Sequence, residues 1–386
     1  MEDLLLRPDI PFPAIPNEVE CKLRVIRNGQ GLQLQTYTFA PKHVSWRGVA
    51  VLIHGASGHT VYEWFLPKER GQTRDQWHGS VCEALVAEGL VVLAVDRQGH
   101  GRSQGHHGLR NYYEKFSYLC DEIEALIKQV IHMDDDLRDL PFFLFGQSLG
   151  GAVAVQMARR AAAAGDHSKY AGMVLYSPML SLERMRQQPF LRCCGTTCLR
   201  TKHIEPLGTL FSCMCPAWQV VKTASFPEDM PFMEAERQAD PFTYKGRARA
   251  RVAKVCADVS KQFLAGGLAE VRTPFIAFQA NRDQFVDPHG AEALLAQAKF
   301  VRPEDKSLVT VGPGEAMDVN MFHLLSVEPG HETVVQAAVE WISGRCGLMA
   351  GAVTGNQSPA QHEMPPKQVE MAEPLPSLPG IPSDLP

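Results

Sequence analysis

A short glycine-rich motif contains the residue that is most clearly suited to chemical reactivity. Ser148 lies between Gly146 and Gly150 in GQSLGG, a G-x-S-x-G pattern that follows the apolar run FFLFG and precedes an alanine-rich helical stretch. In this strand–turn–helix context, a sharp turn lifts the serine Oγ above the edge of a sheet, at the positive end of a helix. Flanking glycines relieve the crowding of such a turn. The motif therefore predicts a nucleophilic serine, with Gln147 in the same turn.

Two backbone N–H groups are candidates for binding the negative charge that develops on a substrate carbonyl. Leu149, the residue after the serine, supplies one of them. The second is expected from the loop after an earlier strand, where His54 and Gly55 precede Ala56. Each donor of this kind stabilises the transition state by roughly 3–4 kcal/mol. We interpret His54 as a structural residue that binds the loop.

An acidic partner is expected after a later strand. Asp283 comes just past the apolar run PFIAFQA, and Asp287 follows it and precedes Pro288. Because the acid normally lies near the strand end, the position favours Asp283. Asp287 is expected to shape the turn or to cap the helix that begins near Gly290.

The base should lie C-terminal to the acid, since the order along the chain is Ser, Asp, His. The candidates are His289, His323, His331 and His362. His289 and His331 are expected at helix starts, and His362 falls in a proline-rich tail. His323 lies in the loop between the last strand and the last helix. It is therefore the expected base, with Asp283 holding its imidazole tautomer.

Alternating apolar runs and helical patterns indicate how these residues are positioned. Strands are predicted at 21–27, 32–40, 48–54, 90–96, 142–146, 172–177, 274–280 and 307–311. Helices are predicted at 76–88, 114–132, 149–164, 290–299 and 332–342. The apolar runs suit strands that are buried on both faces. The fold class predicted is α/β, with a mostly parallel central sheet, helices on both faces and an inserted helical cap.

The predicted organisation has five parts. They are an N-terminal extension (1–20), a first core segment (21–180), a helical cap (181–270), a second core segment (271–348) and a disordered proline-rich tail (349–386). The cap assignment rests on a block without a clear strand that is rich in methionine and aromatic residues. The tail assignment rests on many prolines and no aromatic residue.

Composition and spacing limit the partners and cofactors. The net charge of -5 argues against nucleic-acid binding through basic patches. His106 and His107 have no partner at metal-ligand spacing, so we predict no metal there, and the expected chemistry requires no cofactor. The glycine-rich stretch 96–103 lacks the ending of a phosphate loop and is interpreted as a tight structural loop.

The cap cysteines allow three interpretations. With His203, they could bind zinc, although their irregular spacing favours free thiols. Acylation of Cys193 and Cys194 is the third interpretation. The cysteines in question are Cys193, Cys194, Cys198, Cys213 and Cys215.

The chain resembles the monoacylglycerol lipase and lysophospholipase group of the α/β-hydrolase superfamily. The matching stretches include HGASGH, DRQGHGRSQG, FFLFGQSLGGAVA, ADPFTYKG, PFIAFQANRDQFVDPHGAEAL and FHLLSVEPG. The resemblance implies Ser148 as nucleophile, Asp283 as acid and His323 as base, with the N–H groups of Ala56 and Leu149 as the oxyanion hole. It also implies that the cap covers an acyl-binding tunnel.

Two segments depart from the group's pattern. Residues 59–77 and 312–323 are longer than the corresponding links, and the cap matches little beyond ADPF. Reaction type therefore transfers better than substrate identity.

These observations predict a cytoplasmic serine hydrolase that cleaves a monoacylglycerol, a lipid-ester partner, into glycerol and fatty acid. Lysophospholipids, short esters and thioesters are alternative substrates for the same groups. A non-catalytic hydrolase-fold binding protein is the alternative from another class. Because the substrate is a lipid, we also expect peripheral membrane contact through the cap.

Overall fold

The computed structural model describes residues 5–187, 189–193, 196–221 and 225–354. An eight-stranded sheet with the order β1-β2-β6-β3-β7-β8-β13-β14 forms its centre. The strands are β1 (Val19–Arg27), β2 (Gln33–Pro41), β3 (Gly48–Ile53), β6 (Leu90–Val95), β7 (Phe142–Gln147), β8 (Gly172–Tyr176), β13 (Phe275–Ala280) and β14 (Lys306–Val311). The pairs β1–β2 and β2–β6 are antiparallel, and the remaining pairs are parallel.

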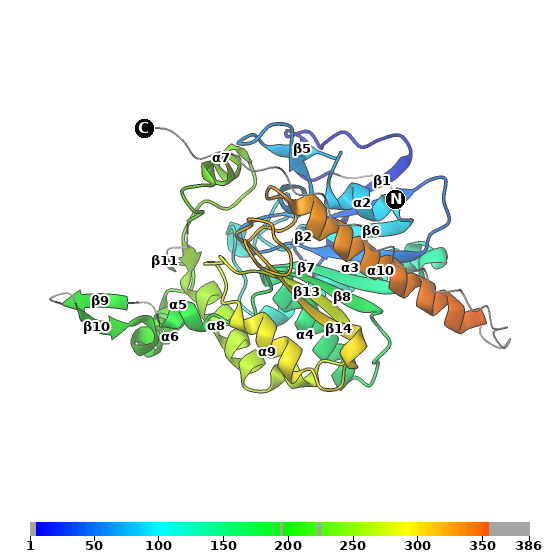
Figure 1. Ribbon diagram of the computed structural model, residues 1–386. Coiled ribbons are helices and arrows are strands. Elements are labelled where there is room, and N and C mark those ends of the chain that lie inside the picture. Colours follow the sequence, from blue (N-terminus) through cyan, green and yellow to red (C-terminus); the bar gives the residue numbers. More distant parts are fainter. Residues whose placement is uncertain (1–4, 188, 194–195, 222–224, 355–386) are drawn as a thin grey trace, which may run out of the picture.

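Helices cover both faces of this sheet (Figure 1). One face carries α3 (Phe116–Met133), α4 (Leu149–Ala163), α8 (Ala250–Leu264) and α9 (His289–Gln297), which share one apolar cluster with it. The other face carries α2 (Val81–Ala87) and α10 (His331–Thr354), which contribute to a second cluster. The central strands are buried on both faces, as their continuous apolar runs require. The predicted α/β class is confirmed.

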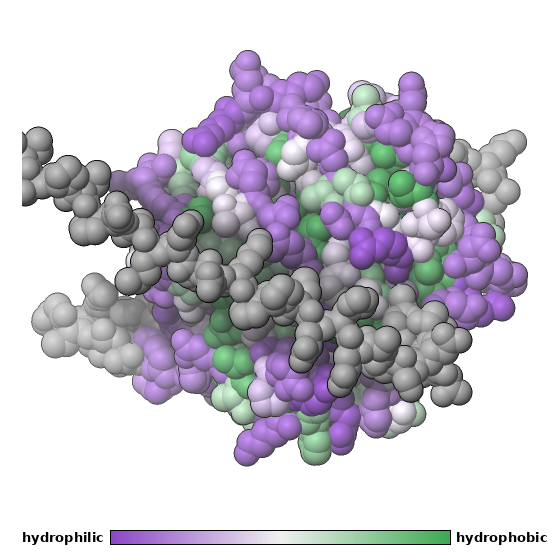
Figure 2. Space-filling view, turned by 45° about the vertical axis from the view of Figure 1, so that its right-hand side comes forward, coloured by the Kyte–Doolittle hydropathy of each residue, from purple (hydrophilic) through white to green (hydrophobic). Residues whose placement is uncertain are grey.

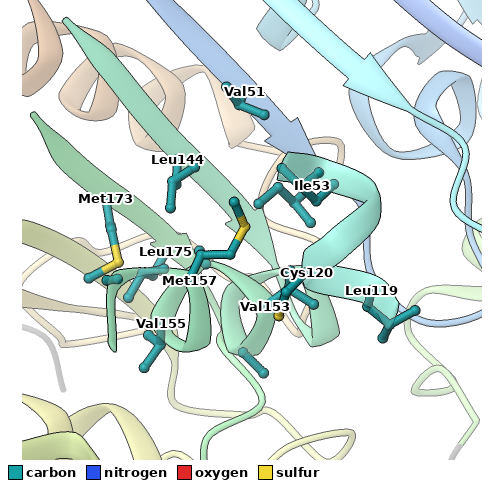
Figure 3. Close-up of a cluster of buried hydrophobic side chains, with 14 of the residues drawn as sticks. Val51, Ile53, Leu119, Cys120, Leu144, Val153, Val155, Met157, Met173 and Leu175 are labelled. Atoms are coloured by element: carbon teal, nitrogen blue, oxygen red, sulfur yellow. The ribbon is translucent and has the colours of Figure 1, made fainter. Parts of the chain in front are cut away.

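Packing beneath the middle of the sheet fixes the turn between β7 and α4. Figure 3 shows Leu144 of β7 and Leu175 of β8 on the side of the sheet that faces α4, which contributes Val153 and Met157. All four side chains are fully buried. The strand and the helix are thus held against each other on both sides of Ser148.

The segment 59–77 contains regular structure of its own. Helix α1 (Thr60–Trp64) is followed by a two-stranded sheet of β4 (Leu66–Pro67) and β5 (Arg74–Gln76). The helix predicted at 76–88 therefore starts late, at Val81. Ser80 caps it by accepting a hydrogen bond from the Glu83 N–H.

The segment predicted as a helical cap contains short strands as well as helices. It contains α5 (Glu183–Arg186), α6 (Glu205–Met214) and α7 (Pro231–Ala239), but also the strand pairs β9–β10 and β11–β12. Their bounds are β9 (Pro189–Cys193), β10 (Thr196–Arg200), β11 (Gln219–Val221) and β12 (Ala248–Arg249). The sequence shows no clear strand in this block because these short strands carry no alternating apolar pattern. Helix α8, assigned to the cap, packs in the same apolar cluster as α3 and α4.

Both ends of the described chain contain ordered structure. Helix α10 continues to Thr354, so the tail predicted to be disordered from 349 begins as helix. Residues 355–386 lie outside the described part of the chain. At the other end, Arg102 donates hydrogen bonds to the carbonyls of Arg7 and Pro11, and the Phe12 ring stacks on Tyr37. The extension is therefore attached to the sheet.

Short 3-10 helices span His106–Gly108, Asp135–Leu137, Thr201–Ile204, Gly267–Glu270 and Pro303–Asp305.

One face of the molecule is mostly polar. On the face shown in Figure 2, hydrophilic residues predominate and hydrophobic residues form smaller groups between them. None of the helices in the described residues combines the length and apolar character needed to cross a bilayer.

Candidate active site

Ser148 lies in a strained turn at the carboxyl end of β7. Its backbone has φ 54° and ψ -117°, a conformation that few residues other than glycine adopt. A Cβ at Gly146 would lie 2.5 Å from the Gly150 carbonyl carbon, and a Cβ at Gly150 would lie 1.8 Å from the Ile53 carbonyl oxygen. Both flanking positions therefore require glycine. These contacts explain the G-x-S-x-G spacing.

Asp283 and His323 form a direct, buried pair. The ring Nδ1 of His323 lies 2.7 Å from Asp283 Oδ2. The other carboxylate oxygen accepts the N–H groups of Phe285 at 2.8 Å and Val286 at 3.0 Å, which fixes its orientation. Burial alone would lower the pKa of His323, but the carboxylates of Asp283, Glu328 and Glu63, with Asp283 contributing most, together raise that pKa above its ordinary value. The pair is therefore suited to stabilise an imidazolium.

The loop that carries His323 is organised around Glu328. The buried Glu328 carboxylate accepts N–H groups from three successive residues, Phe322, His323 and Leu324. Burial raises the pKa of Glu328, and these hydrogen bonds oppose that rise. Sequence reasoning missed this residue. Its only signal was an acidic side chain directly after the apolar stretch FHLLSV.

Gln147 connects the serine turn to the histidine loop. Its Nε2 donates a 2.9 Å hydrogen bond to the carbonyl of His323. The residue next to Ser148 is thus in contact with His323, at the edge of the sheet where β7 ends. Among the described residues, no hydrogen bond joins the Ser148 hydroxyl to the His323 ring. Hydrogen bonds between catalytic groups often tighten only when substrate is bound. The proton transfer between Ser148 and His323 is therefore part of the proposed mechanism below.

Arg97 holds the loop after β3 through hydrogen bonds. The Arg97 guanidinium donates to the carbonyls of His54 and Gly55, and its backbone N–H donates to His54 Nε2 at 3.1 Å. Burial and the nearby Arg97 charge keep the pKa of His54 well below its usual value. Through its hydrogen bonds with Arg97, His54 helps to hold this loop in place. The fully buried Arg97 was not anticipated.

The same loop packs directly against the nucleophile turn. A Cβ at Gly55 would lie 3.1 Å from Ser148 Cβ. Ala56 follows in this loop, while Leu149 opens α4, where first-turn N–H groups have no acceptor within the helix. The two candidate oxyanion donors therefore come from segments that touch at Ser148.

The remaining acidic and histidine candidates lie elsewhere. Asp287 accepts the His289 N–H at 3.2 Å and the Ser181 hydroxyl at 3.0 Å, so it shapes the turn before α9. The His289 side chain is 66% exposed at the start of that helix. His331 opens α10 and contacts the Gly79 carbonyl at 3.2 Å. His362 lies outside the described residues.

The glycine-rich stretch 96–103 is a tight loop beside the site. The Asp96 carboxylate accepts the N–H groups of Thr60 and Arg102 at 2.9 and 2.8 Å and the Tyr37 hydroxyl at 2.7 Å. A Cβ at Gly101 would lie 2.0 Å from an Asp96 oxygen. These contacts explain the glycine and support the interpretation of a structural loop.

One group of potential metal ligands comes together within the described residues. Ligand atoms of His106, His107 and Glu114 lie within 4.8 Å of one another. The sequence suggested no partner for the two histidines, and Glu114 supplies one in space. Two of the three residues are exposed.

The cap cysteines are only partly described. Cys194 lies outside the described residues, and only the backbone is described for Cys193 and Cys198. Cys213 and Cys215 carry free thiols, and the His203 side chain is exposed. The zinc, free-thiol and acylation interpretations of the whole cluster therefore stay predictions.

Comparison with known proteins identifies the family. The family described as "Serine aminopeptidase, S33" matches residues 74–311, which include the serine turn and Asp283. The chain belongs to this hydrolase family. The resemblance to the monoacylglycerol lipase group of the α/β-hydrolases is thereby confirmed.

Relatives of this hydrolase include esterases and lipases. Caffeoylshikimate esterase of Arabidopsis thaliana is 24% identical over 321 residues, covering 80% of this chain and 82% of the relative. Monoacylglycerol lipase of Mycolicibacterium smegmatis is 24% identical over 297 residues, covering 77% and 88%. The crystal structure of Paleococcus ferrophilus monoacylglycerol lipase matches with a TM-score of 0.58 and 19% identity, covering 81% of this chain and 99% of that one. This structural match confirms the α/β-hydrolase fold.

Proposed function

We propose that this hydrolase cleaves the carboxylic ester of a single-acyl lipid, with a monoacylglycerol as the preferred substrate. The observation that carries the proposal is the buried Asp283–His323 pair, joined through Gln147 to the strained turn of Ser148. This arrangement provides a nucleophile, a base and an acid in the chain order of α/β-hydrolases.

In the proposed mechanism, Ser148 attacks the ester carbonyl carbon while His323 accepts the hydroxyl proton. The N–H groups of Ala56 and Leu149 bind the oxyanion. Collapse of the tetrahedral intermediate breaks the ester bond, and the proton on His323 passes to the departing glycerol oxygen. A water molecule then gives a proton to His323 and attacks the acyl carbonyl carbon. The bond between this carbon and Ser148 Oγ breaks, and His323 returns the proton to Oγ, which releases the fatty acid and restores Ser148. Asp283 stabilises the imidazolium in both halves of the reaction.

An apolar cluster beside His323 supports a long-chain substrate. The Phe285 ring centroid lies 4.9 Å from that of His323, and Phe226 of the cap and Phe322 pack against Phe285. Cap residues Met230 and Met233 belong to the same cluster, so they pack against the core and not only within the cap. Apolar walls near a nucleophile favour an acyl chain over a polar substituent.

Exposed apolar side chains on the cap support contact with a lipid surface. Residues of α6 and its neighbourhood with large exposed fractions are Leu207, Leu210, Phe211, Met214 and Trp218. Exposed apolar groups of this kind commonly mark interaction sites. We propose that this part of the cap docks reversibly on the membrane that holds the substrate. The cytoplasmic location stays a prediction.

A lysophospholipid is the second candidate substrate. Phospholipase YtpA of Bacillus subtilis is 32% identical over 139 residues, covering 35% of this chain and 42% of the relative. The chemistry at the ester would be the same, and only the group attached to glycerol would differ.

The test is fatty-acid release from a panel of monoacylglycerols, lysophosphatidylcholine and short p-nitrophenyl esters, with Ser148→Ala as control. Ser148-dependent turnover that favours a monoacylglycerol supports the proposal. A preference for lysophosphatidylcholine selects the second candidate, and activity on short esters alone rejects the long-chain substrate. Full activity in Ser148→Ala refutes the mechanism. Folded protein that neither turns over a substrate nor reacts with a fluorophosphonate would indicate the non-catalytic alternative.

A further inference from the structure

The side chain of Glu63 reaches the loop that carries the second oxyanion donor. Glu63 lies on α1 and is 2% exposed, and its Oε2 accepts the Gly55 N–H at 2.6 Å. Helix α1 is itself fixed at its start, where the Thr60 N–H donates to Asp96. A buried carboxylate on an anchored helix therefore holds the peptide immediately before Ala56.

Close approaches show that this contact leaves little room. A Cβ at Gly55 would lie 3.1 Å from Glu63 Oε1 and also 3.1 Å from Ser148 Cβ. A Cβ at Gly58 would lie only 2.1 Å from the same Glu63 oxygen. The loop is thus packed between Glu63 and the nucleophile turn, and Gly58 leaves the space that the carboxylate fills.

Charged groups surround Glu63 on several sides. Arg97 from the 96–103 loop, Arg74 from β5, His323 and His59 all interact electrostatically with it. Burial raises the pKa of Glu63 to about 7, although the Gly55 N–H and the cationic neighbours oppose that rise. In turn, burial lowers the pKa of His323, and the Glu63 charge contributes to raising it, after the larger contributions of Asp283 and Glu328.

We propose that Glu63 is a positioning residue for the oxyanion hole. Its carboxylate fixes the Gly55 N–H and thereby directs the Ala56 N–H toward the substrate oxyanion. This role rests on the proposed function. The proposal also gives a functional role to segment 59–77, which is longer than the corresponding link in the family pattern. Glu63 acts through the loop and does not contact the substrate.

Truncation and isosteric replacement give opposite expectations. Glu63→Ala removes the acceptor and is expected to lower kcat about 10- to 100-fold, within the range seen when an oxyanion donor is lost, with KM changed less than about twofold. Glu63→Gln keeps a carbonyl oxygen for Gly55 and is expected to retain kcat within about fivefold. A kcat for folded Glu63→Ala within twofold of wild type would overturn the proposal.

Glu122 provides a matched control. It is also a buried carboxylate whose pKa burial raises to about 7, and it accepts the Gln98 N–H at 3.1 Å and the Asn28 side chain at 2.9 Å. Glu122→Ala should lower stability as Glu63→Ala does, but leave kcat within about threefold of wild type in the folded fraction. Equal losses of kcat in the two variants would assign Glu63 a purely structural role.

Gly58 allows a test that does not depend on the folding of Glu63→Ala. Gly58→Ala should displace the carboxylate and lower kcat about tenfold or more, whereas adding it to Glu63→Ala should cost little, because the clashing group is gone. Additive losses, or a wild-type kcat for Gly58→Ala, would contradict the proposal.

The pH profile supplies a readout that a structural role would not move. Because Glu63, Asp283 and Glu328 all raise the pKa of His323, Glu63→Gln should shift the acid limb of kcat/KM to lower pH. An unshifted limb would overturn the electrostatic part of the inference.

The rate of labelling by a fluorophosphonate separates this inference from the proposed function. If wild-type protein is not labelled at Ser148, the proposed function fails. If wild type is labelled and folded Glu63→Ala is labelled equally fast, only the role of Glu63 fails. Slower labelling of Glu63→Ala, with wild-type labelling in Glu122→Ala, supports it.

Discussion

Arg74 and Glu236 form a buried ion pair between segment 59–77 and cap helix α7. Arg74 Nε donates to Glu236 Oε2 at 2.8 Å, and both side chains are at most 2% exposed. The same guanidinium donates to the Tyr62 carbonyl at 2.7 Å and lies 4.0 Å from the centroid of its ring. The long segment beside the site is therefore also an anchor for the cap.

Breaking this pair should destabilise the protein strongly. Glu236→Ala leaves the buried Arg74 without its carboxylate, and losing one partner of a buried pair typically costs about 3–5 kcal/mol. Urea unfolding of the variant should show this loss in the free energy of unfolding. Glu304→Ala is the control, because its pair with Arg302 is exposed to solvent and should contribute little to stability. A cost for Glu236→Ala no larger than that of the control would show that the pair does not anchor the cap.

A second buried pair should make the stability of the fold depend on pH. His59 Nε2 lies 3.0 Å from Asp240 Oδ1. Burial lowers the pKa of His59, but Asp240, Asp96 and Glu63 together raise it above its ordinary value of 6.5. For Asp240, burial would raise the pKa, whereas His59 lowers it. The pKa of Asp240 therefore lies below its ordinary value of 3.8.

The sign follows from these two shifts. The raised His59 pKa stabilises the fold fully below pH 6.5, and this contribution is lost as the pH rises through the folded-state value. The lowered Asp240 pKa contributes above pH 3.8 and is lost as the pH falls through its folded-state value. His59→Gln should therefore cost more stability at pH 5 than at pH 8, as measured by urea unfolding. His289→Gln, at an exposed position, should show no such difference, and an equal cost for His59→Gln at both values would contradict the prediction.

The sequence indicates the strands and the candidate catalytic side chains better than it indicates the buried polar residues that hold the site loops in place. Buried parallel strands appear in the sequence as continuous apolar runs. Asp283 comes shortly after such a strand, and His323 lies in the loop between the last strand and the last helix. Glu63, Arg97 and Glu328 carry no comparable pattern. Their burial is compensated by partners such as the Gly55 N–H and nearby carbonyls, which only the folded chain brings together.

The errors at element boundaries have local causes. The predicted helix 76–88 begins before α2 does, because Gly79 and Ser80 form a turn and a cap that the apolar pattern does not reveal. The predicted helix 332–342 ends before α10 does, because the apolar periodicity of the sequence stops while the backbone remains helical. Within the part of the chain that the structure describes, the cap strands pair with each other and not with the central sheet, so their sequences are not constrained to bury a face in the core.

The exposed apolar side of α6 should govern binding to lipid vesicles. Met214 is 71% exposed, and replacing it with Glu should weaken sedimentation with phosphatidylcholine vesicles severalfold through lost apolar burial and added charge. Leu348→Glu provides the matched control, because Leu348 is also 71% exposed but lies on α10. Turnover of a water-soluble short ester should be unchanged in both variants. Equal vesicle binding by the two variants would place the contact elsewhere.

Asp283 and Asp287 can be separated by paired amide substitutions. Asp283→Asn keeps the side-chain shape but presents a group that no longer fixes the His323 tautomer, so kcat should fall about 10⁴-fold, as in other serine triads. Asp287→Asn keeps an oxygen for the Ser181 hydroxyl or the His289 N–H, and should lower the melting temperature with kcat within about threefold of wild type. Monoacylglycerol turnover and thermal unfolding of both variants give the answer. A larger loss of kcat in Asp287→Asn would transfer the role of the acid to Asp287, despite the 2.7 Å contact of Asp283 with His323.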